Sequence, residues 1–384
     1  MERVPGGLAG LSRSGTRGVK VTWAGSFEPD FNRNRKLARL LALIDADVHV
    51  VREQVWGPDR IDLASTGKLK ALARLSIGIP RLVWRLLRAP APDLYFVSYP
   101  GWFDLPAVWL AAKVRRRPVV FDAFISLFDT LVVDRGFYNS ASLVGRVARM
   151  VDRIALRLAT TVLADTTAHL AYFDVLSPGA LRKGAVLPLG ADDSVFYPRP
   201  EVEIESELVL FHGTFVPLQG VTTVIDAARL LESRGVRFVL IGDGQDRGSA
   251  EERIAEHGLE NVELVGLMPL ADLPNHLAMA TVCLGIFGDS PKAGRVVPNK
   301  VYECLALERP IVTRESEAID EMLTQDEIAT VPPRDPVALA EAITAILEDR
   351  GLREKMARAG RDRYERSFHE KALAETLRRV LNSV

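Results

Sequence analysis

The chain has 384 residues, a length that suggests two domains of ordinary size rather than one. Lysine and arginine total 49 against 50 aspartate and glutamate, so the formal net charge of -1 gives no bulk attraction to nucleic acid. Cys283 and Cys304 lie in apolar runs and the six histidines are scattered, so we expect buried thiols in a reducing compartment and no metal site.

The first 18 residues are rich in glycine, serine and arginine and contain no apolar core segment. We therefore predict a flexible lead-in over 1–18 and no secretory signal. No stretch of the sequence reaches the 18 apolar residues expected of a transmembrane helix. These features predict a cytoplasmic protein.

Short β-branched runs alternate with longer helical patterns along the chain. Strands are predicted at 19–23, 47–51, 94–98, 119–122, 161–164 and 185–187, and again at 208–211, 238–241, 262–265, 282–285, 310–312 and 329–331. Strands separated by helices form βαβ units with parallel sheets. Two such series predict an α/β protein with two Rossmann-like domains, and ligand sites at the carboxyl ends of the strands. With two facing domains, we expect the functional site in the cleft between them.

In the first series, charged residues follow two of the strands. Arg33 and Arg35 lie after the first strand and either hold an anionic acceptor group or face water. Asp122 ends the strand at 119–122, and Asp129 follows it in a largely apolar setting. Carboxylates in such positions suit catalysis or hydroxyl binding. We predict a catalytic role for Asp122 and an acceptor-side role for Arg33, Arg35 and Asp129.

The segment 69–88 places five basic residues among apolar ones and contains Gly78 and Pro80, which we expect to interrupt it. Such a pattern is typical of a helix that rests on an anionic membrane surface, or of a surface helix packed by its apolar stripe. Arginines around 150–158 form a second basic face. The inner face of a membrane is therefore one of the partners that we consider, through peripheral contact.

The two series join within 190–207, which is polar and interrupted by prolines before an acidic run. Such composition predicts an exposed linker. We place the N-terminal domain at 19–195 and the C-terminal domain at 196–366, followed by a last segment at 367–384.

Glycine-containing turns follow the first two strands of the second series. Residues 208–220 have the sequence LVLFHGTFVPLQG, in which a buried strand runs into Gly213 and Gly220 precedes a helix. Glycine lets the backbone approach a ligand, and a helix start offers free amides to phosphate, although an ordinary turn is the alternative. Gly242 opens the tip of the next strand, whereas for Asp243 we favour turn or capping chemistry.

The loops after the next two strands differ in character. Gly266 and Leu267 follow the strand at 262–265, where backbone groups can contact a base edge. The loop that leads to residue 300 is polar and basic, with Lys292 and Arg295. We expect Lys292 to be solvated and Arg295 to add positive charge beside a helix start.

The most informative stretch is 298–312, PNKVYECLALERPIV. Pro298 is favoured at a helix start, where the unpaired amides of Asn299 and its neighbours form an anion site. Lys300 and Glu303 lie three residues apart and share one helical face, where they can reach a phosphate and a hydroxyl pair. This combination suits a nucleoside-diphosphate sugar.

In order and spacing, these elements resemble glycosyltransferase family 4, whose members have the GT-B architecture of two Rossmann-like domains facing across a cleft. The resemblance covers most of the chain and is strongest from 208 to 312. It implies transfer of a sugar from a nucleotide-sugar with retention of anomeric configuration and no obligatory metal or cofactor. It also implies that the final helix crosses back onto the N-terminal domain.

The resemblance assigns roles by position. Glu303 matches the acidic residue that holds the ribose hydroxyls, and the turn at Gly242 and residues 265–267 would border the base. The donor-binding set is Gly213, Thr214, Gln219, Gly242, Gly266, Leu267, Pro298, Asn299, Lys300 and Glu303. The chain departs from the family at Arg295, where a glutamate is frequent, and at Thr214 and Gln219, where an arginine and a lysine are usual. A histidine of the N-terminal domain would fall near Phe124.

We therefore predict a retaining glycosyltransferase of glycan, glycolipid or cell-surface polysaccharide biosynthesis, acting on a glycan, lipid-linked or small-molecule acceptor. As the donor bond breaks, Lys300, Arg295 and the helix amides would stabilise the charge that grows on the leaving diphosphate. The alternative is a catalytically silent module that binds a nucleotide-sugar or scaffolds an assembly. A dehydrogenase lacks support because neither series has the glycine fingerprint after its first strand.

Overall fold

The computed structural model describes residues 18–53, 68–134 and 136–384, with side chains from residue 78 onward in the second range. The lead-in predicted at 1–18 therefore lies almost wholly outside the described residues. The chain divides into two compact units, each treated separately below. Unit 1 comprises Met1–Val132, Tyr138–Leu187 and Leu373–Val384, and unit 2 comprises Val133–Phe137 and Pro188–Ala372.

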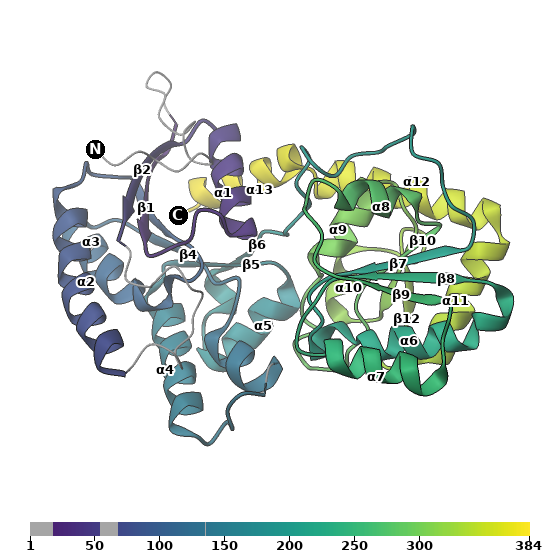
Figure 1. The fold of residues 1–384 in the computed structure, drawn as a ribbon. Helices are drawn as coiled ribbons and strands as arrows, with labels where there is room; N and C mark the ends of the chain where they lie inside the picture. Colours follow the sequence, from purple (N-terminus) through teal and green to yellow (C-terminus); the bar gives the residue numbers. More distant parts are fainter. Residues whose placement is uncertain (1–17, 54–67, 135) are drawn as a thin grey trace. The chain divides into compact units, whose positions relative to one another are not determined.

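Unit 1 is built on a six-stranded parallel sheet in the order β2-β1-β3-β4-β5-β6 (Figure 1). Its strands are β1 (Lys20–Gly25), β2 (Asp47–Arg52), β3 (Leu94–Val97), β4 (Val119–Asp122), β5 (Thr161–Ala164) and β6 (Gly184–Val186). Its helices are α1 (Asn32–Leu43), α2 (Lys68–Arg88), α3 (Leu105–Arg115), α4 (Leu143–Leu158) and α5 (Thr167–Leu176), with short turns at Gly101–Phe103, Asp129–Asp134 and Leu181–Lys183.

Unit 2 has a second six-stranded parallel sheet, in the order β12-β11-β10-β7-β8-β9. Its strands are β7 (Leu208–His212), β8 (Arg237–Ile241), β9 (Val262–Val265), β10 (Val282–Leu284), β11 (Ile311–Arg314) and β12 (Ala329–Val331). Its helices are α6 (Val221–Leu230), α7 (Arg247–His257), α8 (Leu273–Met279), α9 (Asn299–Ala306), α10 (Glu317–Met322), α11 (Pro336–Glu348) and α12 (Arg350–Ser367), with turns at Pro217–Gln219 and Glu232–Arg234. α13 (Glu370–Asn382) begins in unit 2 and continues into unit 1.

Each predicted strand is confirmed, with ends that agree within two residues. The reason is that the central strands are buried on both faces and are therefore continuous apolar runs, as in LVLFH of β7. The predicted α/β class with two Rossmann-like domains is likewise confirmed.

The last helix contributes to the core of unit 1. Leu373, Leu377 and Leu381 are buried in the cluster that contains Trp23 of β1 and Phe96 of β3. Their spacing of four residues places them on one helical face, which is the face that α13 buries. Unit 1 is thus completed by the end of the chain.

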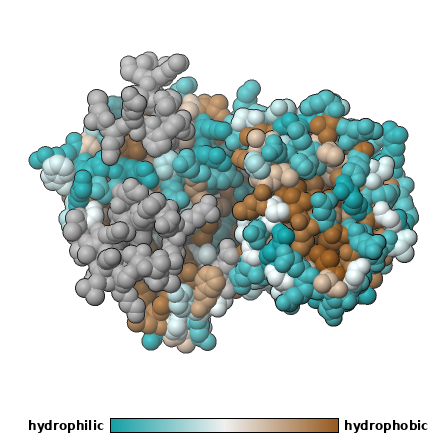
Figure 2. All heavy atoms as spheres, in the orientation of Figure 1, coloured by the Kyte–Doolittle hydropathy of each residue, from teal (hydrophilic) through white to brown (hydrophobic). Residues whose placement is uncertain are grey.

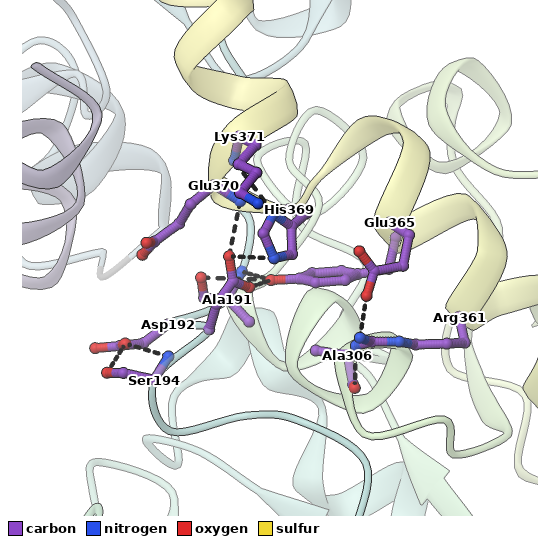
Figure 3. Close-up of polar contacts among 11 residues, drawn as sticks. Ala191, Asp192, Ser194, Ala306, Arg361, Glu365, His369, Glu370 and Lys371 are labelled. Atoms are coloured by element: carbon purple, nitrogen blue, oxygen red, sulfur yellow. Dashed lines mark hydrogen bonds and ion pairs between the residues drawn. The ribbon is translucent and has the colours of Figure 1, made fainter. Parts of the chain in front are cut away.

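The prediction of an exposed linker over 190–207 was wrong for its first part. Ala191 and Phe196 are buried, and Asp193 is bonded to the start of α13. Figure 3 labels Ala191 and Glu370 in this cluster of polar contacts. The Asp193 carboxylate accepts hydrogen bonds from the Tyr364 hydroxyl and from the Glu370 backbone N–H, the latter at 2.7 Å. Polar composition did not reveal this cluster because its partners come from α12 and α13, far along the chain.

One surface helix of unit 1, α2, differs from expectation. α2 runs unbroken through Gly78 and Pro80, so the predicted interruption was wrong. Arg85 Nη1 donates to Glu53 at 2.7 Å. Within the described residues, no helix combines the length and the apolar character needed to cross a membrane.

Candidate active site

The strand order of unit 2 places its site-forming loops together. β7 lies between β10 and β8. The chain first adds β8 and β9 on one side of β7 and then adds β10, β11 and β12 on the other side, so the strand order reverses between β7 and β10. Ligands of open α/β sheets bind at the carboxyl ends of the strands beside such a switch point. Gly213 follows β7 there, and α9 follows the loop after β10. These are the two segments from which most of the predicted donor-binding residues come.

Lys300 is the centre of this arrangement. Its side chain is buried, its Nζ donates to Gln219 Oε1, and Nζ lies 3.7 Å from the centroid of the Phe211 ring. Gly213 is adjacent, because a Cβ built on it would lie 2.5 Å from Gln219 Oε1 and 2.9 Å from Lys300 Nζ. The structure thus brings together Gly213, Gln219 and Lys300, which the sequence placed on two separate loops.

The electrostatics of Lys300 are unusual for a lysine. Burial lowers the pKa of its ammonium to about 7, against smaller opposing effects of Cys304 and Glu303. No carboxylate of the described chain forms an ion pair with Nζ, whose polar partner is the neutral Gln219 amide. A buried cation normally has a counter-ion. An anion bound beside Gly213 would supply it.

Gly242 lies where the tip of β8 meets the loop after β7. Its φ is +145°, and a Cβ there would lie 1.9 Å from the Gly213 carbonyl oxygen. Only glycine tolerates so close an approach of two backbones. Asp243 serves turn chemistry, as its Oδ1 accepts from the Gly244 N–H at 2.7 Å. Gly242 therefore shapes the loop that carries Gly213.

The start of α9 supplies free backbone donors. Pro298 is the N-cap, with extended backbone, and Asn299 is the first helical residue. The amide of Val301 is already bonded to the Pro298 carbonyl. The amides of Asn299 and Lys300, which precede it, are therefore the donors that the helix start offers to a ligand. Among the described side chains, no group of three His, Cys, Asp or Glu residues is arranged to hold a metal ion.

His212 is a site residue that sequence reasoning missed. It is the last residue of β7, and its Nε2 lies 2.7 Å from Glu303 Oε2 on α9. Its Nδ1 is buried without a hydrogen-bond partner in the described structure. A polar residue at the carboxyl end of an otherwise apolar strand was the available signal. The contact fixes one carboxylate oxygen of Glu303, the predicted ribose-binding residue.

Arg295 lines a cavity of about 610 Å³ in unit 2, together with Gly294, Arg314 and Glu315. A second cavity of about 440 Å³ lies at the amino ends of β7, β10 and β11, the wrong edge of the sheet for a ligand. The prediction that Lys292 is solvated was wrong. Its Nζ lies 3.1 Å from Asp134 Oδ2, and its side chain is largely buried.

The remaining predicted donor residues are less constrained. Thr214 is exposed in the loop after β7. Gly266 and Leu267 follow β9, with Leu267 exposed and no atom near a Cβ built on Gly266. All three residues are therefore open to solvent.

In unit 1, the predicted residues Arg33 and Asp122 form a buried ion pair. Arg33 Nη2 donates to Asp122 Oδ1 at 2.8 Å and Nε to Oδ2 at 3.1 Å. Nη2 also donates to the Leu187 carbonyl at 3.1 Å. The alternative that Arg33 faces water was therefore wrong. The pair joins α1, the end of β4 and the residue after β6, and Asp122 is reached by a substrate only where the pair opens.

The other acceptor-side candidates lie apart from this pair. Arg35 is half-buried on α1, and Asp129 is buried in the turn after β4. The Asp129 N–H donates to Ser126 Oγ, which in turn donates to Asp152 at 2.7 Å. Burial raises the pKa of Asp152 to about 6.

Two family models match the chain in succession. A glycosyl transferase 4-like domain matches residues 9–190, and a domain of the glycosyl transferases group 1 matches residues 206–349. The chain belongs to the group 1, family 4-like glycosyltransferases.

Relatives within this glycosyltransferase family include the probable glycosyltransferase WbjE of Pseudomonas aeruginosa, 30% identical over 42% of this chain and 41% of WbjE. Alpha-D-kanosaminyltransferase of Streptomyces kanamyceticus is 28% identical over 39% of each chain. The capsular polysaccharide biosynthesis glycosyltransferase CapM of Staphylococcus aureus is 22% identical over 62% of this chain and 65% of CapM. The matches thus span from about two fifths to two thirds of these relatives.

Solved structures share the fold over nearly the whole chain. Anabaena HepE in complex with UDP-glucose has a TM-score of 0.69 at 16% identity, covering 95% of this chain and 100% of HepE. Sucrose-phosphate synthase from Thermosynechococcus elongatus has a TM-score of 0.70 at 18% identity, covering 96% and 99%. The chain therefore has the two-domain GT-B fold.

Proposed function

We propose that the protein is a retaining glycosyltransferase that moves a sugar from a nucleoside-diphosphate sugar to an acceptor hydroxyl in glycan, glycolipid or cell-surface polysaccharide biosynthesis. One observation carries the proposal. Lys300 is a buried ammonium at the switch point of unit 2, beside a glycine loop and a helix start, with no counter-ion in the described chain. A diphosphate supplies that charge and accepts from the free amides.

The donor would lie along unit 2 in a defined direction. Its diphosphate occupies the space at Gly213, Asn299 and Lys300, and its ribose hydroxyls donate to the Glu303 carboxylate that His212 holds. The base lies toward Gly266, where the open edge accepts a flat ring. HepE, a structural neighbour, has been crystallised with UDP-glucose, which supports a nucleotide-sugar donor.

Bond cleavage leaves negative charge on the terminal phosphate of the donor. We propose that Lys300 and Arg295 stabilise this charge, an interaction that strengthens as the transition state forms. No metal or other cofactor is required in this scheme, because cationic side chains and helix amides carry the charge. The departing phosphate accepts the proton of the acceptor hydroxyl on the same face of the sugar. Acceptor contacts are assigned to Arg33, Arg35 and Asp129 of unit 1, and Asp122 keeps its proposed catalytic role.

A silent binding module is the second candidate. Thr214 and Gln219 stand where the family usually has an arginine and a lysine, so two phosphate-binding cations are replaced. In the structure Gln219 instead holds Lys300. A silent module would bind nucleotide without cleaving the donor.

The test uses the purified full chain with UDP-, GDP- and ADP-sugars. Binding of one class should raise the melting temperature, since a ligand that binds only the folded state stabilises it. Release of nucleoside diphosphate with an acceptor present, and an α-configured product from an α-configured donor, would establish retaining transfer. Lys300→Met should abolish both the release of nucleoside diphosphate and the formation of the α-configured product. Binding without turnover across an acceptor panel would establish the silent module.

A further inference from the structure

Helix α4 has an apolar stripe on the face that it exposes to solvent. Leu143, Val147, Met150 and Ile154 are exposed by 71, 42, 53 and 40%, and their spacing of three and four residues aligns them. The opposite face is the one that packs on unit 1, through Gly145, Ala148, Asp152, Ala155 and Leu156. A surface helix needs one apolar face for packing, so the second face of α4 is unexplained by the fold.

Arginines run beside this stripe. Arg146, Arg149, Arg153 and Arg157 are exposed and follow the same helical spacing. The single acid of α4, Asp152, is buried, where it accepts from Ser126 Oγ and from two backbone N–H groups. The exposed side of α4 therefore combines apolar and positive groups with no negative charge.

The same chemistry appears on the helices that precede α4 in unit 1. Arg88 lies over the ring of Trp84 on α2, with its guanidinium carbon 4.1 Å from the ring centroid, and Trp84 is half-exposed. Leu110 and Val114, one turn apart on α3, are exposed as well. At the lower end of α4 as Figure 1 draws it, Figure 2 shows hydrophobic residues at the surface beside hydrophilic ones.

We propose that the exposed face of α4 docks on an anionic lipid bilayer. Leu143, Val147, Met150 and Ile154 enter the headgroup boundary, and the arginines beside them meet lipid phosphates. The stripe spans 12 residues, or about 18 Å of helix, so α4 lies in the interface and does not cross it. A second copy of the chain fits less well, since a twofold contact would bring two arginine-bordered faces together without acids to neutralise them.

This inference stands apart from the proposed sugar transfer, because binding to vesicles is measured without a donor. It adds to that function a location at a membrane surface, where lipid-linked acceptors are found. Failure of either proposal leaves the other intact.

The first experiment measures partition of the full chain onto vesicles of phosphatidylcholine alone or mixed with phosphatidylglycerol. We expect binding to the anionic vesicles only, weakening as salt rises. R146Q/R157Q should lower the partition coefficient about 25-fold, from roughly fivefold per arginine near an anionic surface. V147S/M150S should lower it more than about tenfold through lost apolar burial.

The matched control is V337S/L352S, which removes two exposed apolar side chains from helices α11 and α12 of unit 2. It should bind as the wild type does, and all three variants should keep the wild-type melting temperature. Equal binding of V147S/M150S and wild type, or no binding to anionic vesicles, would overturn the proposal.

The second experiment places a probe in the stripe. Met150→Cys can be labelled selectively with an environment-sensitive dye, because Cys283 and Cys304 are buried. Its emission should shift to the blue on anionic vesicles, whereas a dye at Val337→Cys should not shift. A blue shift that instead follows protein concentration in the absence of lipid would identify a second copy as the occupant and refute the membrane assignment.

Discussion

His212 Nε2 lies 2.7 Å from Glu303 Oε2, and both side chains are close to nine-tenths buried. The imidazole therefore holds one carboxylate oxygen and leaves the other for a ligand. A carboxylate that accepts two ribose hydroxyls binds best when it is already oriented in the free protein. If the side chain had to be ordered on binding, the entropy lost would weaken the affinity for the nucleotide. His212 is thus a positioning residue for the proposed donor site.

His212→Phe should weaken nucleotide binding about tenfold or more, since hydrogen bonds to charged groups contribute about 1.5–3 kcal/mol. The KM for the donor should rise while kcat changes little, because the contact is made in the ground state as well. Calorimetry with the nucleoside diphosphate and steady-state kinetics measure these effects. His276→Phe is the control, as His276 is only half-buried on α8 of the same unit and its ring nitrogen contacts the Asp272 backbone carbonyl. Unchanged affinity in His212→Phe would remove the positioning role.

Lys300 should couple nucleotide binding to proton uptake. Burial lowers its pKa to about 7, so at pH 8 the unbound side chain is mostly neutral. A bound diphosphate favours the ammonium and raises that pKa, so binding at pH 8 takes up close to one proton, whereas binding at pH 6 takes up almost none. Affinity should fall by up to about tenfold per pH unit above pH 7.

Calorimetry in buffers of different ionisation enthalpy measures the uptake. Lys300→Met should show neither uptake nor this pH dependence. The unliganded wild type should also gain stability from this residue as pH rises from about 7 toward 10.5, because the unfolded chain holds the proton that the folded chain has lost. If wild type and Lys300→Met take up equal numbers of protons at pH 8, the diphosphate does not bind beside Nζ.

Gly213→Ala should disrupt the donor site with the fold retained. Its backbone φ is +150°, and the new Cβ would lie 2.5 Å from Gln219 Oε1 and 2.9 Å from Lys300 Nζ. Both are ends of flexible side chains, so they move aside and the phosphate space is lost. Gly258→Ala is the matched control, because Gly258 also has positive φ but no atom within 4 Å of its Cβ.

We expect both glycine variants to lose about 1–2 kcal/mol of stability to backbone strain. Only Gly213→Ala should lose nucleotide binding, by tenfold or more in a thermal-shift titration. Equal nucleotide affinity in the two variants would move the diphosphate away from the loop after β7.

The fold was largely predictable because hydrophobic pattern and turn residues agree along the whole chain. PNKVYECLA shows its helix start and its charged pair in the sequence itself, and α9 forms there. The contacts between loops were not predictable in the same way. The pairing of Arg33 with Asp122 spans 89 positions, and that of His212 with Glu303 spans 91. Both depend on strand order, which local patterns do not specify.

The face of α4 illustrates the opposite case. The sequence showed a second basic face around 150–158, but whether this helix packs or exposes its apolar residues depends on neighbouring elements. The structure shows that α4 packs through Gly145, Ala148, Ala155 and Leu156 and leaves the larger residues of the stripe exposed. The sequence pattern therefore shows that such a helix carries basic and apolar residues, but it does not show which face packs on the rest of the protein.

The buried pair of Arg33 and Asp122 allows a test of the predicted catalytic role of Asp122. Asp122→Leu leaves the Arg33 guanidinium buried without its anion and should cost about 3–5 kcal/mol of stability. Arg33→Met combined with Asp122→Leu removes both charges and should regain most of that loss, because an apolar pair of similar volume packs without desolvating ions. Urea unfolding of the three proteins measures this. The exposed pair of Arg350 and Glu354 is the control, and Glu354→Gln should leave the unfolding midpoint unchanged.

Activity of the folded double variant then decides the role of Asp122. If its carboxylate takes part in the reaction, the double variant should bind nucleotide as the wild type does and turn over at least a hundredfold more slowly, within the range expected for a general base or acid. A double variant with wild-type turnover would show that Asp122 serves only to anchor Arg33. Nucleotide affinity is the internal check, since the proposed donor contacts all lie in unit 2 and should not change.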